Sequence, residues 1–107
     1  MKVIYLLGST LAGNLWSMQR NISNAQQWAY KLWQMGYAVI CPQLNGLFMN
    51  DSLGRIYVQG NMEIVKRCDA IFKYDKSFKY FTEIERVCSE NKIPVFDSLD
   101  KMYKDLI

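Results

Sequence analysis

VIYLLGST, residues 3–10, is the stretch of this sequence that decides the fold. Its first five residues form an unbroken apolar, β-prone run, which is typical of a strand buried on both faces of a parallel sheet. The run ends at Gly8, where the backbone can approach a ligand closely, and the hydroxyls of Ser9 and Thr10 can donate hydrogen bonds to phosphate or sugar oxygens. The turn matches neither the G-x-G-x-x-G fingerprint nor a P-loop. The turn therefore indicates a ligand site but does not identify the ligand. The alternative interpretation is that Gly8 only ends the strand.

Strands and helices alternate along the rest of the chain. Three more apolar runs predict strands, at 38–41, 70–72 and 94–96. Apolar residues at helical spacing predict helices over about 22–35, 58–68, 80–91 and 99–106. This order predicts an α/β fold in which right-handed crossovers build a parallel sheet of about four to five strands with helices on both faces. The connections 8–20, 42–57 and 73–79 would then meet beyond the carboxyl ends of the strands, where such sheets bind ligands.

The composition bounds the size of the fold and its partners. With 107 residues, 50% of them hydrophobic, the chain fits a single domain, 1–107, with an ordinary core. A net charge of +3 suits a small anionic ligand and lacks the basic clustering of a nucleic-acid-binding surface. No apolar run approaches the roughly 18 residues of a membrane span. Neither a nucleic acid nor a membrane is therefore an expected partner.

Cysteine and histidine usage narrow the chemistry further. The three cysteines are far apart and form no CxxC pair, which argues against a disulfide framework or a zinc site and favours a reducing, cytoplasmic location. The sequence contains no histidine, which excludes Ser-His-Asp and Cys-His catalysis as well as histidine-based metal sites. Any catalysis must therefore use other side chains, and we expect no metal and no cofactor.

The helix predicted over 80–91 carries the best candidates for a catalytic carboxylate. Ser77 can cap its start, and Glu83 lies in an early turn, where the helix dipole and free amide groups keep a carboxylate ionised. Glu85 follows two residues later, about 200° around the helix, so the two cannot act together on one substrate. At most one is catalytic, and the alternative is that both are solvated surface charges. Trp16, expected in the 8–20 loop, would pack on a ligand base or on a partner subunit.

A set of short motifs runs through nearly the whole chain. They are Gly8-Ser9, Asn21-Ile22, Leu32-Trp33 with Gly36, Val39-Ile40-Cys41-Pro42 with Asn45, Arg67-Cys68-Asp69-Ala70, Ser77 with Glu83, and Ile93-Pro94-Val95. Ser77 and Glu83 follow the pattern Ser-x-Gly-x-x-x-Glu apart from its glycine. In this order the motifs resemble the nucleoside 2-deoxyribosyltransferase superfamily, and in particular its small phage and bacterial members.

The resemblance implies a flavodoxin-like three-layer αβα sandwich that acts on the N-glycosidic bond of a deoxynucleoside or its monophosphate. Glu83 matches the nucleophile that attacks C1′ of the sugar, which makes Glu85 a bystander. Ser9 and Ser77 match positions that contact phosphate or sugar. Together with the turn residues and Trp16, the expected substrate-binding set is Gly8, Ser9, Thr10, Trp16, Asn45, Asn61, Asp69, Ser77 and Lys79. Relatives assemble as dimers or higher oligomers, so a homo-oligomer is also expected.

Two positions depart from the pattern of these relatives. Lys79 stands where the motif has glycine, and Asn61 stands where an acid precedes the third strand. Asparagine cannot transfer a proton as a carboxyl group does, whereas Lys76 and Lys79 could bind a phosphate directly. These departures motivate an alternative, a nucleotide-binding module that senses or sequesters a nucleotide in its own or a phage host's cytoplasm. A protein-interaction role on the same fold is a third possibility.

Overall fold

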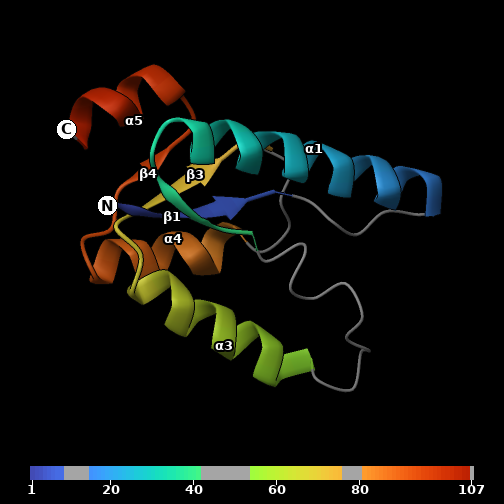
Figure 1. The fold of residues 1–107 in the computed structure, drawn as a ribbon. Helices are drawn as coiled ribbons and strands as arrows, with labels where there is room; N and C mark the ends of the chain where they lie inside the picture. Colours follow the sequence, from blue (N-terminus) through green and yellow to red (C-terminus); the bar gives the residue numbers. More distant parts are fainter. Residues whose placement is uncertain (9–14, 42–53, 76–80, 107) are drawn as a thin grey trace.

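The computed structural model describes residues 1–8, 15–41, 54–75 and 81–106. Its elements are β1 (Val3–Leu7), α1 (Leu15–Gln34), β2 (Ala38–Ile40), α3 (Gly54–Lys66), β3 (Ala70–Lys73), α4 (Phe81–Glu90), β4 (Val95–Phe96) and α5 (Leu99–Asp105). The strands form one four-stranded parallel sheet in the order β2-β1-β3-β4 (Figure 1). The alternation of strands and helices in the sequence predicted this parallel α/β architecture.

The central strand β1 is buried on both faces, because its side chains alternate between two hydrophobic layers. Ile4 and Leu6 pack in the layer beneath α1 and α5, whereas Tyr5 and Leu7 pack in the layer beneath α3 and α4. All four side chains are at most 2% exposed. Figure 1 shows α1 and α5 above the sheet and α3 and α4 below it. The fold is therefore a three-layer αβα sandwich of the flavodoxin-like kind, as the sequence indicates.

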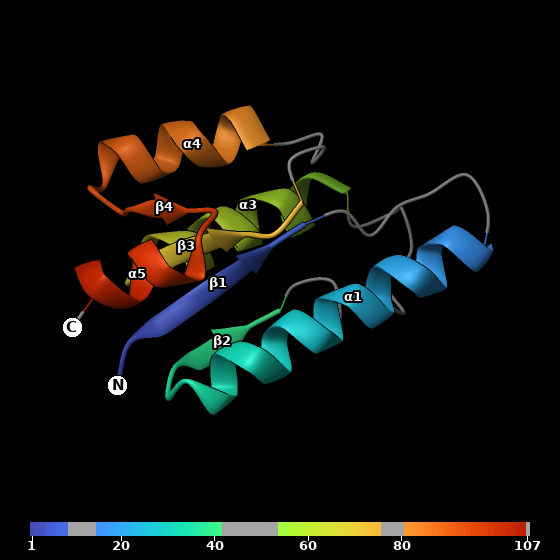
Figure 2. The same cartoon turned by 90° about the horizontal axis from the view of Figure 1, so that it is seen from above.

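Helix α1 begins earlier than its apolar pattern predicts. The sequence predicts a loop through about residue 20, but the helix starts at Leu15 and carries Trp16, which is 75% exposed. None of the described side chains from Trp16 to Asn24 is buried, and Ala25 is the first that is. Figures 1 and 2 show that this half of α1 runs past the ends of the strands, so no sheet lies beneath it. Apolar periodicity reveals only the part of a helix that packs on something.

The other boundaries differ from the predicted ones by a few residues. Helix α3 covers Gly54–Lys66, so it starts and ends earlier than the predicted 58–68. Strand β4 excludes Pro94, which has no N–H to donate, although its carbonyl accepts from the N–H of Ile71 at 2.9 Å. Within the described ranges, no helix combines the length and the apolar character needed to cross a membrane.

A glycine ends α1 in the way the sequence predicts. Gly36 has φ +93°, and around it the N–H groups of Gly36 and Tyr37 donate to the carbonyls of Trp33 and Leu32 at 3.0 and 3.3 Å. This is the hydrogen-bond pattern of a Schellman motif. It turns the chain from α1 into β2, so the positive φ at Gly36 sets the packing of the first βαβ unit.

We predict that Gly36→Ala destabilises the protein by about 1 kcal/mol, because a Cβ is strained at positive φ. A Cβ built at Gly36 meets no atom within 4 Å, so the cost is one of backbone conformation alone. Urea unfolding followed by circular dichroism would measure it.

Gly60→Ala is the matched control. Gly60 lies inside α3, and a Cβ there also meets no atom within 4 Å. Because alanine is the better helix former, we expect this variant to gain about 0.5–1 kcal/mol. The same sign of change in both variants would contradict our account of the α1 terminus.

Candidate functional site

The carboxyl ends of β1 and β3 form the switch point of the sheet. In the strand order, β2 lies on one side of β1 and β3 on the other, so the crossovers diverge between β1 and β3. Leu7 and Lys73 are paired at this end, and the N–H of Tyr74 donates to the carbonyl of Leu7 at 3.1 Å. Parallel α/β sheets bind their ligands at such a point. Gly8 and Tyr74, the first residues beyond the two strands, therefore define the candidate site.

Gly8 is packed against a side chain of the protein itself. A Cβ at this position would overlap the far end of the Tyr74 ring. Because Ile4 and Leu6 face α1 and side chains alternate along a strand, position 8 faces α1 as well. Tyr74 thus occupies the space that a side chain at position 8 would need. The sequence predicts a glycine that lets a ligand approach, and the structure adds that the absence of a Cβ at this position makes room for Tyr74.

An aromatic group holds the Tyr74 ring in place on the α1 side. Trp28 of α1 stacks on Tyr74 with 6.3 Å between ring centroids and 25° between ring planes. The same Trp28 packs on Phe72 at 5.3 Å, and the Lys31 ammonium lies 5.2 Å from the Trp28 ring centroid. We call Trp28, Phe72 and Tyr74 the aromatic wall. Trp28 packs against the core of the α1 layer, and the sequence gave no signal for Tyr74.

The opposite side of the sheet, beneath α3 and α4, is a hydrophobic layer that includes a hydrogen bond between two polar side chains. Tyr5 points to this side from β1, and its hydroxyl donates to Oδ1 of Asn61 on α3 at 3.0 Å. Asn61, a predicted binding residue, is half-buried. The two sides therefore differ in chemistry, with aromatic rings toward α1 and, toward α3, a tyrosine–asparagine hydrogen bond within a hydrophobic layer.

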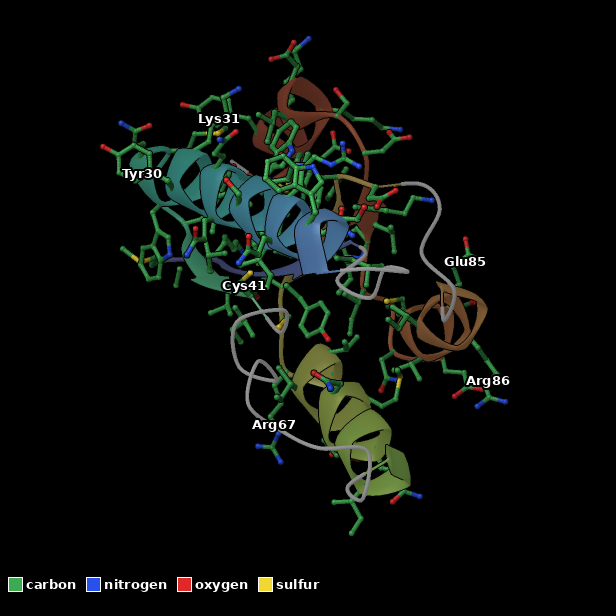
Figure 3. All side chains as sticks on the ribbon, turned by 90° about the vertical axis from the view of Figure 1, so that its right-hand side faces the viewer. Tyr30, Lys31, Cys41, Arg67, Glu85 and Arg86 are labelled. Carbon is green, nitrogen blue, oxygen red and sulfur yellow. The ribbon has the colours of Figure 1, made fainter. Side chains whose placement is uncertain are left out.

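Helix α4, which carries Glu83, lies on the same side of the sheet as Asn61. Ile84, Val87 and Cys88 are buried against the sheet and fix the helix. Glu83 is the third residue of α4, in its first turn, and its side chain lies outside the described part of the structure. Glu85 is exposed, and Figure 3, which looks at this edge of the sheet, shows it pointing away from the molecule. The helix dipole stabilises an ionised carboxylate in the first turn. Glu83 is therefore better placed than Glu85 to act as a catalytic carboxylate.

Of the remaining predicted site residues, the structure describes Asp69 and Trp16, and Asp69 lies away from the switch point. Asp69 lies at the opposite, amino edge of the sheet, where Oδ2 accepts from the N–H of Val3 at 2.7 Å and its own N–H donates to the Val3 carbonyl at 2.9 Å. It therefore secures the start of β1. Trp16 lies on α1 and not in a loop. The others, Ser9, Thr10, Asn45, Ser77 and Lys79, lie outside the described residues.

Cys68 and Cys88 are not activated thiols. Burial raises the pKa of both Cys68 and Cys88 to about 11, and a raised pKa keeps the thiol protonated at neutral pH. Cys41, at the end of β2, is half-buried against the α1 layer (Figure 3). The described residues also include no group of three or more His, Cys, Asp or Glu side chains that could hold a metal ion.

A shallow depression of about 400 Å³ lies elsewhere, between the end of α1 and α5. Met35, Asp100, Tyr103 and Lys104 line it. These residues lie at the other end of α1 from Trp16, so the depression is not part of the switch point.

The fold matches that of a solved enzyme. The structure of the 2-deoxyribosyltransferase from the psychrotolerant bacterium Bacillus psychrosaccharolyticus superposes with a TM-score of 0.60 at 17% sequence identity, over 87% of this chain and 69% of that one. No protein-family model matches the sequence, and no curated protein matches it either. At this identity the likeness shows a shared fold, which supports the three-layer architecture described above.

We predict that Gly8→Ala destabilises the protein by about 1–3 kcal/mol, because the new methyl group must push the Tyr74 ring off Trp28. The cost should fall sharply when the same substitution is made in a Tyr74→Ala background. A double-mutant cycle measured by urea unfolding tests this coupling. Equal costs in the two backgrounds would show that Tyr74 is not what position 8 accommodates.

We also predict that Cys68 and Cys88 resist thiol reagents at pH 8 in the native protein, whereas Cys41 reacts first. The native pKa values of about 11 exceed the value of 9.0 for an unperturbed thiol. The stability linked to these groups is therefore complete below pH 9 and is lost as the pH rises through 11. Mass mapping of alkylated thiols over time gives the order, and early labelling of Cys88 would contradict it.

Proposed function

We propose that this chain is a nucleoside 2-deoxyribosyltransferase-like enzyme that acts on the N-glycosidic bond of a deoxynucleoside or its monophosphate, with Glu83 as nucleophile. The observation that carries the proposal is the position of Glu83 in the first turn of α4, on the helix that follows β3 at the switch point. The Ser77 to Glu83 motif and the fold shared with a 2-deoxyribosyltransferase support it. We further propose that residues 1–107 form a single domain of this kind.

The proposed reaction has two displacement steps. In the first, a carboxylate oxygen of Glu83 bonds to C1′ of the sugar while the C1′–N bond breaks, and the electron pair leaves with the base, which takes a proton from water. In the second, water or a second base attacks C1′, the carboxylate leaves, and the attacking group loses a proton. Two inversions at C1′ give net retention of configuration.

The side of the switch point beneath α3 and α4 would receive the sugar. Asn61 can donate and accept hydrogen bonds there, and its contact with the Tyr5 hydroxyl fixes the position of its side-chain oxygen. An amide cannot serve as the general acid for the departing base. We therefore propose that Asn61 orients the sugar and that catalysis depends mainly on the covalent step at Glu83.

The proposed partners follow from this chemistry. They are a nucleoside or nucleotide and, as the sequence suggests, further copies of the chain in a homodimer or larger assembly. We propose a cytoplasmic location, where deoxynucleosides and their monophosphates are available.

We predict that Glu83→Gln lowers the rate of base release by at least about 1,000-fold, because the amide oxygen is a poor nucleophile. Glu85→Gln is the matched control, since Glu85 is exposed on the same helix two residues later. Chromatography of free base from a panel of deoxynucleosides and monophosphates measures the rate. Intact-mass analysis of the wild-type protein should also detect a deoxyribosyl adduct that the Glu83 variant lacks.

Two results would overturn the proposal. If the Glu83→Gln variant released base at the same rate as the wild-type protein, Glu83 would not be the nucleophile. Binding of a nucleotide by the wild-type protein without release of base would favour a sensing or sequestering module instead, and such binding would appear as a rise in melting temperature.

A further inference from the structure

The aromatic wall ends at the point where the proposed substrate would enter. Phe72 and Tyr74 lie two residues apart at the end of β3, so both side chains face α1, and Tyr74 is the last of them. Its ring covers Gly8 at the end of β1. It thereby closes the α1 side of the switch point, while Asn61 and the start of α4 lie on the other side of the sheet.

The Tyr74 ring is also fixed and partly accessible. Its backbone is tied to β1 by the hydrogen bond from its N–H to the Leu7 carbonyl, and its ring is stacked on Trp28. Trp28 in turn packs on Phe72 and lies near the Lys31 ammonium. The Tyr74 side chain is nevertheless only half-buried. A ring that is held in this way loses little conformational entropy when a flat ligand packs on it.

We infer that the nucleobase of the substrate stacks on Tyr74 at the aromatic wall and that the sugar extends to the side of Asn61 and α4. Tyr74 would thereby select for a ligand that carries a base. This inference rests on the proposed function and adds the orientation of the substrate to it. Every nucleobase has an aromatic face, so stacking recognises the base without requiring one particular base. Tyr74 would therefore distinguish a nucleoside from a sugar that lacks a base.

Binding of matched ligands to Tyr74 variants tests the inference. The probes are deoxyadenosine, deoxyguanosine, deoxycytidine and thymidine, each with and without a 5′-phosphate, and 2-deoxyribose 5-phosphate, which lacks a base. Calorimetry measures their affinities for the wild-type protein and for the Tyr74→Phe, Tyr74→Leu and Tyr103→Leu variants. Tyr103 is an exposed tyrosine of α5 and serves as the control.

We expect Tyr74→Leu to weaken each nucleoside that binds by roughly 5- to 150-fold, the range for loss of one base–aromatic stack. Tyr74→Phe and Tyr103→Leu should bind as the wild type does. The affinity for 2-deoxyribose 5-phosphate should not change in any variant. Equal nucleoside affinity in the wild-type and Tyr74→Leu proteins overturns the stacking role but leaves the proposed function intact. Failure of the wild-type protein to bind any nucleoside or nucleotide overturns both.

A second measurement keeps Tyr74 in place, in case Tyr74→Leu does not fold. The chain has three tryptophans, and Trp16 and Trp33 are 75% and 53% exposed on α1. Replacing these two with phenylalanine leaves Trp28 as the fluorescent reporter behind Tyr74. We expect a nucleoside that calorimetry shows to be bound to change the Trp28 emission, and 2-deoxyribose 5-phosphate to leave it unchanged. An unchanged emission with bound nucleoside contradicts stacking at the wall.

Discussion

Because β1 has a hydrophobic layer on each face and a paired strand at each edge, everything else in the structure is arranged around it. Its neighbours β2 and β3 satisfy its backbone hydrogen bonds on both sides. Its side chains require helices above and below the sheet to exclude water. Those helices can be supplied only by crossovers that leave β1 and β3 in opposite directions. The switch point at Gly8 and Tyr74 is thus a consequence of burying β1.

The two faces of β1 also account for the unequal sides of the candidate site. Side-chain alternation sends position 8 toward α1, where Tyr74 and Trp28 fill the space with aromatic rings. The same alternation sends Tyr5 toward α3, where its hydroxyl meets Asn61. In the proposed function, the aromatic side would take the base of a nucleoside, and the Asn61 side would take its hydroxyl-bearing sugar. Because side chains alternate along β1, this one strand contributes to both sides, with position 8 toward the rings and Tyr5 toward Asn61.

The sequence was sufficient to predict those parts of the fold in which the type of each residue reflects its own burial or backbone conformation. Apolar runs identified the four strands, and Gly36 marked the end of α1, because burial and a positive φ each restrict the residue found there. The exposed half of α1 was missed, since a helix with nothing beneath it shows no apolar stripe. Asp69 was assigned to the site by resemblance, although a residue just before a parallel strand must lie at the amino edge. Tyr74 was missed because its role depends on Gly8 and Trp28, which are distant in sequence.

The overhang of α1 beyond the sheet divides that helix into two parts with different sources of stability. From Ala25 onward the helix is anchored by buried side chains, so its amide hydrogens can exchange with solvent only when the core opens. Before Ala25 it has no buried described side chain, and its sequence there includes Asn21, Ser23 and Asn24, which are weak helix formers. Buried side chains therefore contribute less to the stability of that half than to the rest of the helix. The core thus anchors α1 where the helix crosses the sheet, whereas local helix propensity has the larger share in holding the part that passes beyond it.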